Sequence, residues 1–262
     1  MRVSLGVATN IDIKEINLPT SLTHAYLVPL SDFHVGDINF DEKKLQGYID
    51  WILANDNAYA ILNGDILNTA TKESVSDCYT GLRPQEELEK AVKLLLPIKD
   101  RILASVSGNH CRRVYKSVGI DFSKLLADRL GCYYAGDEAY LKIKVGAGIN
   151  GKPIVYTLYA THGHQGGRSV GAKVNAIAKL ANTCMADLYC YSHIHTLTAH
   201  VDLYLVPDIR TNKMNEIKRT FVSSGAFLKR GGYAVTHGYP ASKLGSPRIR
   251  LSGSVRDVHV SL

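Results

Sequence analysis

Short apolar segments that end in aspartate, asparagine or histidine are the feature that most constrains how this chain can fold. Five strand-like segments, at 24–30, 59–62, 101–106, 154–160 and 187–191, each run directly into a polar loop. The loops read Ser-Asp-Phe-His, Gly-Asp, Gly-Asn-His, Thr-His-Gly-His and Ser-His-Ile-His. The carboxyl ends of parallel strands meet at one edge of a sheet, where α/β proteins bind their ligands. The pattern therefore predicts an α/β fold in which these polar residues converge.

Amphipathic segments separate the strands in the first part of the chain. Residues 41–55 carry apolar side chains at helical spacing, and residues 84–98 begin with proline and acidic residues, as helices often do. A third helix is predicted over 117–130, where Gly131 would end it, and a fourth over 171–181. Alternating strands and helices favour a layered α/β core.

The rest of the chain has β patterns and no sign of a domain boundary. Residues 140–145 and 154–160 resemble two strands joined by an Asn-Gly turn, and residues 197–262 contain only β-type segments and turns. Because no linker or internal repeat divides the sequence, we expect a single domain over 1–262. We expect the β-rich region to form a second sheet packed on the first, and residues 1–22 to add an edge strand.

Composition argues against several classes of protein. The apolar runs are far shorter than the roughly 18 residues that a membrane helix needs, and the first residues lack the pattern of a secretory signal. Five cysteines without a Cys-x-x-Cys motif argue against a disulfide scaffold. We therefore expect a protein of the reducing cytoplasm without a membrane partner. The formal net charge of +7 favours an anionic partner, such as a phosphate ester or a nucleic acid.

The residue types in the five loops are those that bind divalent metal ions. Carboxylate, amide oxygen and imidazole together suit Mn²⁺, Fe²⁺, Zn²⁺ or Ni²⁺, and one aspartate can bridge two ions. In the Asp-x-His and His-x-His motifs, alternate residues of an extended backbone face the same side. The glycines before Asp65 and Asn109 would let the backbone turn sharply near the ions. Each motif alone is more often a cap or a turn, but their joint occurrence indicates a metal site.

The order of these motifs resembles the signature of the calcineurin-like metallophosphoesterases. The similarity runs from Asp32 to His195, with the five motifs in the family's order. It implies a four-layer α/β sandwich of two sheets, with helices on the outer faces, and a dinuclear metal centre. The implied ligands of the first ion are Asp32, His34, Asp65 and His195. The implied ligands of the second ion are Asp65, which would bridge the two ions, with Asn109, His162 and His193. His110 would lie beside the ions as the catalytic histidine.

Two positions depart from the family's pattern, and one assignment has an alternative. Cys111 stands where the family usually has an acidic residue that supports the catalytic histidine, and Ser192 stands where it has glycine. Either His162 or His164 could supply the lone histidine ligand, and His162 is favoured because it lies nearer the end of its strand. Candidates for contacts with the substrate, each with a turn or surface role as the alternative, are His164, Arg168 and Arg112.

The sequence therefore predicts a metal-dependent phosphoric ester hydrolase. Two divalent ions, manganese first with iron, zinc or nickel as alternatives, would activate a hydroxide that attacks the phosphorus of the substrate. His110 would protonate or stabilise the leaving alkoxide. The positive charge favours a phosphodiesterase or nuclease. A phosphatase for a small or protein-borne phosphomonoester is the alternative, and a non-catalytic metal-binding scaffold is a third interpretation. The sequence leaves the oligomeric state open.

Overall fold

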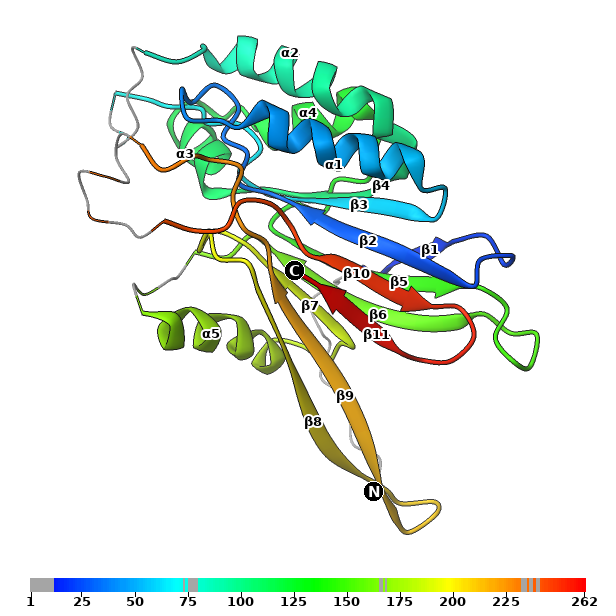
Figure 1. The fold of residues 1–262 in the computed structure, drawn as a ribbon. Helices are drawn as coiled ribbons and strands as arrows, with labels where there is room; N and C mark the ends of the chain where they lie inside the picture. Colours follow the sequence, from blue (N-terminus) through cyan, green and yellow to red (C-terminus); the bar gives the residue numbers. More distant parts are fainter. Residues whose placement is uncertain are drawn as a thin grey trace.

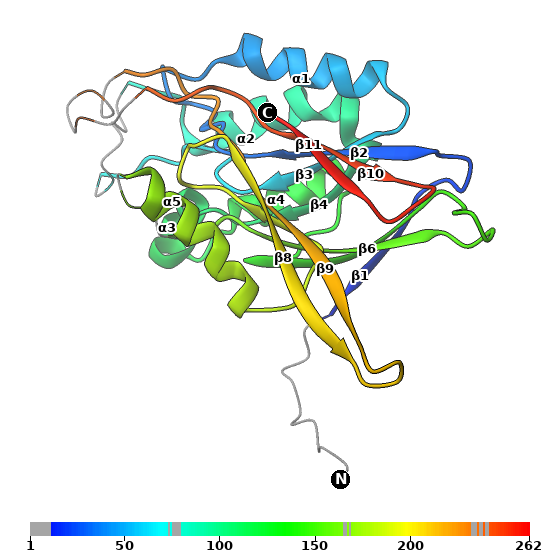
Figure 2. The ribbon, with the colours of Figure 1, turned by 60° about the horizontal axis from the view of Figure 1, so that its bottom comes forward.

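The computed structural model of the chain contains two β-sheets flanked by helices (Figure 1). It describes residues 12–72, 74, 80–164, 167, 169–231, 235, 238 and 241–262. The order of strands is β1-β5-β6-β7-β9-β8 in the six-stranded sheet and β11-β10-β2-β3-β4 in the five-stranded sheet. Both sheets mix parallel and antiparallel pairs, as Figure 2 shows from another side.

The strands agree closely with the predicted segments. The six-stranded sheet comprises β1 (Lys14–Asn17), β5 (Glu138–Val145), β6 (Ile154–Thr161), β7 (Leu188–Tyr191), β9 (Lys213–Ser223) and β8 (Thr198–Asp208). The five-stranded sheet comprises β11 (Val258–Ser261), β10 (Arg248–Ser252), β2 (His24–Leu30), β3 (Ala58–Asn63) and β4 (Ile102–Val106). β1 is an edge strand that pairs in parallel with β5.

The helices lie outside the two sheets. They are α1 (Glu42–Ala54), α2 (Pro84–Leu95), α3 (Asn109–Val118), α4 (Phe122–Leu130) and α5 (Val170–Ala178), with 3₁₀ turns η1 (Leu96–Arg101) and η2 (Lys179–Asn182). None of the helices in the described segments is long and apolar enough to span a membrane.

Burial of both faces of each sheet produces four layers. Successive residues of β2 point to opposite faces, so Leu27 packs between the sheets while Val28 packs beneath the helices. In the figures, α1, α2 and α4 lie over the outer face of the five-stranded sheet (Figures 1 and 2). Ile177 of α5 packs against Tyr159 and Phe221 on the outer face of the six-stranded sheet. The predicted two-sheet sandwich with outer helices is therefore confirmed.

Local signals explain where the first helices begin and end. Asp41 caps α1, because its carboxylate accepts the N–H of Lys44 at 3.1 Å. Leu45, Ile49 and Ile52 form the buried stripe of this helix. The helix predicted over 84–98 is α-helical only to Leu95 and continues as the 3₁₀ turn η1, which contains Pro97.

The prediction of one helix over 117–130 is wrong. Residues 117 and 118 are the end of α3, which begins at Asn109 and ends against Gly119 in the left-handed conformation. A separate helix, α4, begins after Asp121, whose carboxylate accepts the N–H of Lys124 at 3.0 Å. The cap and the left-handed glycine thus divide the segment into two helices, and the first of them begins at the predicted Asn-His motif.

The β-rich end of the chain contributes to both sheets, and does not form a second sheet alone. β8 and β9 make a long hairpin in the six-stranded sheet that extends away from the body of the molecule (Figure 1). β10 instead pairs with β2, and β11 pairs with β10, so both lie in the five-stranded sheet.

The parallel strands bring the predicted polar loops to one edge. β2, β3 and β4 are parallel neighbours in one sheet, and β6 and β7 are parallel neighbours in the other. Backbone hydrogen bonds join their loops. Asp32 N–H donates to Gly64 O at 3.1 Å, and Ser192 N–H donates to His162 O at 3.2 Å. The carboxyl ends of five strands thus meet across the sandwich.

Candidate metal centre

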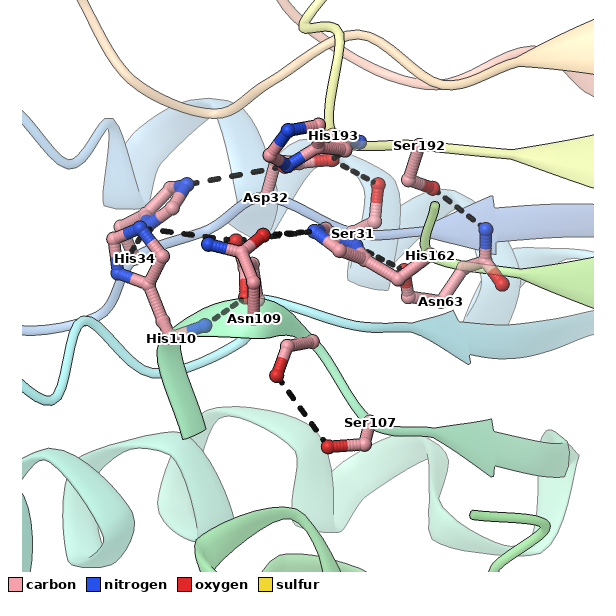
Figure 3. Close-up of polar contacts among 12 residues, drawn as sticks. Ser31, Asp32, His34, Asn63, Ser107, Asn109, His110, His162, Ser192 and His193 are labelled. Atoms are coloured by element: carbon pink, nitrogen blue, oxygen red, sulfur yellow. Dashed lines mark hydrogen bonds and ion pairs between the residues drawn. The ribbon is translucent and has the colours of Figure 1, made fainter. Parts of the chain in front are cut away.

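Residues from all five loops converge at this edge (Figure 3). Three groups of carboxylate and imidazole atoms have all their potential ligand atoms within 4.8 Å of one another. The groups are Asp32 with His34 and His195, His34 with Asp65 and His110, and Asp65 with His162 and His193.

The first group brings two imidazoles to one oxygen of Asp32. Nε2 of His195 lies 3.1 Å from Oδ1 of Asp32, and Nε2 of His34 lies 3.9 Å from it. The two Nε2 atoms are 3.4 Å apart. Three potential ligand atoms from two separate loops therefore face a common point.

The group of Asp65, His162 and His193 forms around the other buried aspartate. Nε2 of His162 lies 3.1 Å from Oδ2 of Asp65 and 3.1 Å from Oδ1 of Asn109. The ring of His193 lies 5.4 Å, centroid to centroid, from the ring of His162. The amide oxygen of Asn109 thus joins the carboxylate and imidazoles of this group.

His34 and Asp65 each belong to two groups, and His110 stands beside both residues. Nδ1 of His110 is 3.3 Å from Nδ1 of His34, and its Nε2 is 3.8 Å from Oδ2 of Asp65. The N–H of His110 also donates to Oδ1 of Asp65 at 2.9 Å. The three groups therefore form one continuous cluster, with His110 at its border.

The backbone of the cluster is unusual. Positive φ angles occur at five of the seven predicted ligands: Asp32 (53°), His34 (52°), Asp65 (49°), His193 (69°) and His195 (49°). Residues other than glycine rarely adopt this conformation, which aspartate and histidine tolerate better than most and which clusters at functional sites. The extended backbone expected for the Asp-x-His and His-x-His motifs is therefore wrong. Left-handed turns direct these side chains, and His193 and His195 enter different groups.

Glycine is required beside Asp65 for two different reasons. Gly64 has a φ of 84°, and a β-carbon there would lie 2.6 Å from the ring of His162. Gly108, before Asn109, has an ordinary φ of −112°, but a β-carbon there would overlap the backbone and carboxylate of Asp65. The predicted sharp turn is present at Gly64, whereas Gly108 provides space.

A buried network of hydrogen-bonded polar side chains supports the residues of the cluster. Ser31 Oγ donates to Oδ2 of Asp32 at 2.7 Å, and it also lies 2.5 Å from Oγ of Ser224. Ser192 Oγ is 2.8 Å from Ser224 Oγ and accepts from Nδ2 of Asn63 at 2.6 Å. Sequence reasoning missed Ser31, Asn63 and Ser224. Only Ser192 was noticed in the sequence, because it stands where the similar family has glycine.

Two of these contacts orient potential ligand atoms. Nδ1 of His162 lies 2.9 Å from the carbonyl oxygen of Asn63, so Nδ1–H donates there and Nε2 is the ring nitrogen that faces Asp65 and Asn109. Oδ2 of Asp32 accepts from Ser31 and from the N–H of His193, at 3.2 Å. The other oxygen of Asp32, Oδ1, is left to face the imidazoles.

The charges of the cluster depend on opposing effects. Burial would raise the pKa of Asp32, but His195 and His162 outweigh it and lower the pKa to about 2. Burial acts in the same direction on Asp65, whose pKa His162 and His110 hold well below the usual range. Burial lowers the pKa of His34, which stays neutral. Two ionised carboxylates and at least one neutral imidazole therefore face one another in a buried site.

Divalent cations fit this donor set. Oδ1 of Asp32 is buried, and among the described residues only the imidazoles of His195 and His34 face it, so a cation between these three groups would compensate its charge. Oxygen and imidazole nitrogen donors suit cations such as Mn²⁺, Fe²⁺, Zn²⁺ and Ni²⁺. The cluster could thus hold one ion near Asp32 and another near His162, with Asp65 between them.

The remaining predicted residues lie at or beyond the border of the cluster. His162 is 2% exposed, whereas His164 is exposed and outside the three groups. Arg112 is exposed and forms an ion pair with Asp137. Arg168 lies outside the described residues.

Cys111 is directed into the core beneath the five-stranded sheet, away from the polar cluster. Its side chain is 2% exposed among apolar neighbours, and burial raises the pKa of its thiol to about 12. A neutral buried thiol does not replace an acidic group, so the support for His110 has to come from elsewhere in the structure.

Comparison with known proteins identifies the family. The family model described as calcineurin-like phosphoesterase matches residues 31–197, which is more than half of the chain and includes all five loops. The chain belongs to the calcineurin-like phosphoesterase family. None of the curated proteins matches it.

Several solved structures are similar to this family member. A conserved Streptococcus pneumoniae protein, described as a predicted phosphoesterase, is 14% identical over 92% of this chain and 90% of its own, with a TM-score of 0.39. The calcineurin-like phosphoesterase YfkN from Bacillus subtilis is 13% identical over 91% and 90%, with a TM-score of 0.44. A single mutant of Vps29 from Entamoeba histolytica is 14% identical over 90% and 89%, with a TM-score of 0.42.

Proposed function

We propose that this chain is a hydrolase of phosphate esters that works with two divalent metal ions. The observation that carries the proposal is the sharing of His34 and Asp65 between neighbouring groups of potential ligands. A single-ion site needs one such group, whereas overlapping groups with a common carboxylate suit two adjacent ions. Membership of the calcineurin-like phosphoesterase family supports the same reaction class.

The proposed roles follow the geometry of the cluster. One ion is held by Asp32, His34, Asp65 and His195, and the other by Asp65, Asn109, His162 and His193. When bound, two such ions supply positive charge for the phosphoryl oxygens and lower the pKa of water toward neutrality. We propose manganese as the native metal.

His110 is the proposed catalytic residue of the chain. Its Nδ1 lies 2.8 Å from the carbonyl oxygen of Asn68, which accepts Nδ1–H and leaves Nε2 directed toward the cluster. Burial lowers the pKa of this imidazole, so in the proposed role the ring carries the transferred proton on Nε2 only transiently. From this position Nε2 can give a proton to the oxygen that leaves phosphorus, which contributes about 10²- to 10⁴-fold to a rate.

For the substrate we propose a phosphodiester, with nucleic acid as the favoured class. The formal net charge of +7 supports an anionic polymer. His164, Arg168 and Arg112 remain proposed contacts for it, and in the structure Arg112 is paired with Asp137. Activity on a monoester in place of a diester would assign the site to a phosphatase.

The test is turnover of bis-p-nitrophenyl phosphate and p-nitrophenyl phosphate by purified protein with Mn²⁺, Fe²⁺, Zn²⁺ or Ni²⁺. We expect hydrolysis of the diester and a loss of about 10²- to 10⁴-fold in His110→Ala, which keeps its metal content. Metal binding without turnover of either compound, or of DNA and RNA, would contradict the proposal and favour a scaffold.

A further inference from the structure

Thr69, in the loop after β3, has a strained backbone that is held by hydrogen bonds to Glu87 and Arg113. It is a β-branched residue with a φ of 41°, a conformation that such residues almost never adopt. Strain of this kind persists only where the surroundings fix the backbone, and it gathers at functional sites. The contacts of Thr69 therefore indicate which function this loop serves.

Two ionisable side chains bind the two polar groups of the Thr69 backbone. Oε2 of Glu87, on α2, accepts its N–H at 2.7 Å, and Nε of Arg113, on α3, donates to its carbonyl oxygen at 3.0 Å. Nη2 of Arg113 also donates to the carbonyl oxygen of Asn68, the preceding residue. Glu87 and Arg113, on two different helices, thus both bind the backbone of the Asn68–Thr69 segment.

The fixed Asn68 carbonyl faces the proposed catalytic histidine. It lies 2.8 Å from Nδ1 of His110, and Nη2 of Arg113 lies 2.8 Å from the same ring nitrogen. The imidazole and the guanidinium therefore converge on one carbonyl oxygen. This arrangement holds the plane of the ring while Nε2 points toward Asp65, 3.8 Å from its Oδ2.

Burial of Glu87 is hard to explain by packing alone. Its side chain is 0% exposed and its second oxygen, Oε1, has no hydrogen-bond partner among the described residues. Burying a carboxyl is costly, and an apolar side chain would fill the same space without that cost. What the carboxyl provides is a fixed acceptor for the N–H of Thr69.

We propose that Glu87 and Arg113 are positioning residues for His110. Glu87 acts through the Asn68–Thr69 backbone, and Arg113 acts through that backbone and through its own contact with Nδ1 of His110. The proposal rests on the proposed function for its effect on rate, but its structural part does not. Without either side chain, the Asn68 carbonyl and the ring that it holds would move from the geometry that proton transfer needs. A misplacement of about 1 Å at a reacting group can cost about 10²-fold in rate.

The kinetic test is a double-mutant cycle between Arg113→Met and His110→Ala, with a diester substrate. We expect Arg113→Met to lower kcat about 10- to 100-fold with little change in KM, and to add little further loss in the His110→Ala background. The loss should grow as the leaving group becomes poorer, because poor leaving groups depend most on proton donation. An equal loss with and without His110 would overturn the proposal.

Conservative and control variants separate positioning from general damage. Glu87→Gln keeps an oxygen acceptor for Thr69 and should retain most activity, whereas Glu87→Leu should resemble Arg113→Met. Lys116→Met and Glu89→Leu remove exposed charges from the same two helices and should change nothing. If Arg113→Met does not fold, Arg113→Lys serves instead, since a lysine cannot bind both carbonyls in the same way.

A second readout does not depend on activity. In zinc-loaded protein labelled with ¹⁵N-histidine, the ring signals of His110, assigned from their absence in His110→Gln, should report one ring state with a hydrogen-bonded Nδ1. We expect Arg113→Met and Glu87→Leu to shift or broaden them, and Lys116→Met to leave them unchanged. Unchanged signals in both test variants would overturn the positioning role. A wild-type protein that shows the signals but hydrolyses no ester would overturn the proposed function instead.

Discussion

The buried carboxyl of Glu87 predicts how the stability of the protein changes with pH. Burial raises its pKa from 4.5 to about 7, against the opposing effects of the Thr69 N–H and of Arg113. Between these two values the folded protein keeps a proton that the unfolded chain has lost, so stability falls as pH rises. Each pKa unit corresponds to about 1.4 kcal/mol, so Glu87 costs the folded state about 3 kcal/mol above neutral pH.

Glu87→Gln removes this ionisation and keeps an acceptor for the N–H of Thr69. We therefore expect the variant to be more stable than the wild type by about 3 kcal/mol near pH 8, and about equally stable near pH 4.5. The assay is urea unfolding followed by circular dichroism, with a chelator present so that metal binding does not vary. Glu89→Gln, on the exposed side of the same helix, is the control. If the free energies of unfolding of Glu87→Gln and wild type differ by the same amount at pH 4.5 and pH 8, the reasoning is refuted.

Three further predictions concern the candidate metal centre and its surroundings. In wild type, Mn²⁺ at about 100 times its Kd should stabilise the fold by about 2.7 kcal/mol, or very roughly 5–10 °C in Tm, and Asp65→Asn should lose most of that gain in differential scanning fluorimetry. An unchanged gain would show that Asp65 is not shared by the ions. Gly64→Ala should cost about 1–3 kcal/mol in urea unfolding, because alanine there must adopt a φ of 84° against the ring of His162. A variant as stable as wild type would mean that the loop relaxes freely. Cys111 should react with a thiol reagent only after unfolding, since its thiol is buried and burial raises its pKa to about 12. Peptide mapping that shows rapid modification of Cys111 in the folded protein would contradict its placement in the core.

The strands and the meeting of their loops could be predicted because both depend on local patterns. Segments 59–62 and, after His24, 24–30 are apolar, as expected for strands that are buried on both faces, and each ends where its polar loop begins. The meeting of the loops then follows because the carboxyl ends of parallel strands lie at one edge of a sheet. The residues of the cluster were visible in the sequence for the same reason, since each directly follows a strand.

Helix α3, which begins at the Asn-His motif, was not predicted, because its signals are weak. Residues 109–118 are mainly polar, and only Cys111 and Val114 are buried, so the helical stripe is too short to recognise. The left-handed backbone at Asp32 and His34 also escaped prediction, because no local pattern marks it. These conformations are imposed by hydrogen bonds to other loops, such as that from Phe227 N–H to Asp32 O.

The other site residues that were not predicted depend on contacts between distant parts of the chain. Ser224 reaches Ser31 across 193 positions, and nothing near Ser224 in the sequence marks it as part of the site. Glu87 looked like one of several acidic residues at the start of a helix, where charge favours the helix dipole. Only the fold shows that it is the buried one, directed at the loop after β3.

Anomalous diffraction from crystals grown with Mn²⁺ tests the central claim most directly, because it locates each ion without reference to activity. We expect two neighbouring peaks, one within bonding distance of Asp32, His34 and His195 and the other of Asn109, His162 and His193, with Asp65 contacting both. A single peak, or none, in well-folded crystals at saturating Mn²⁺ would contradict the dinuclear site.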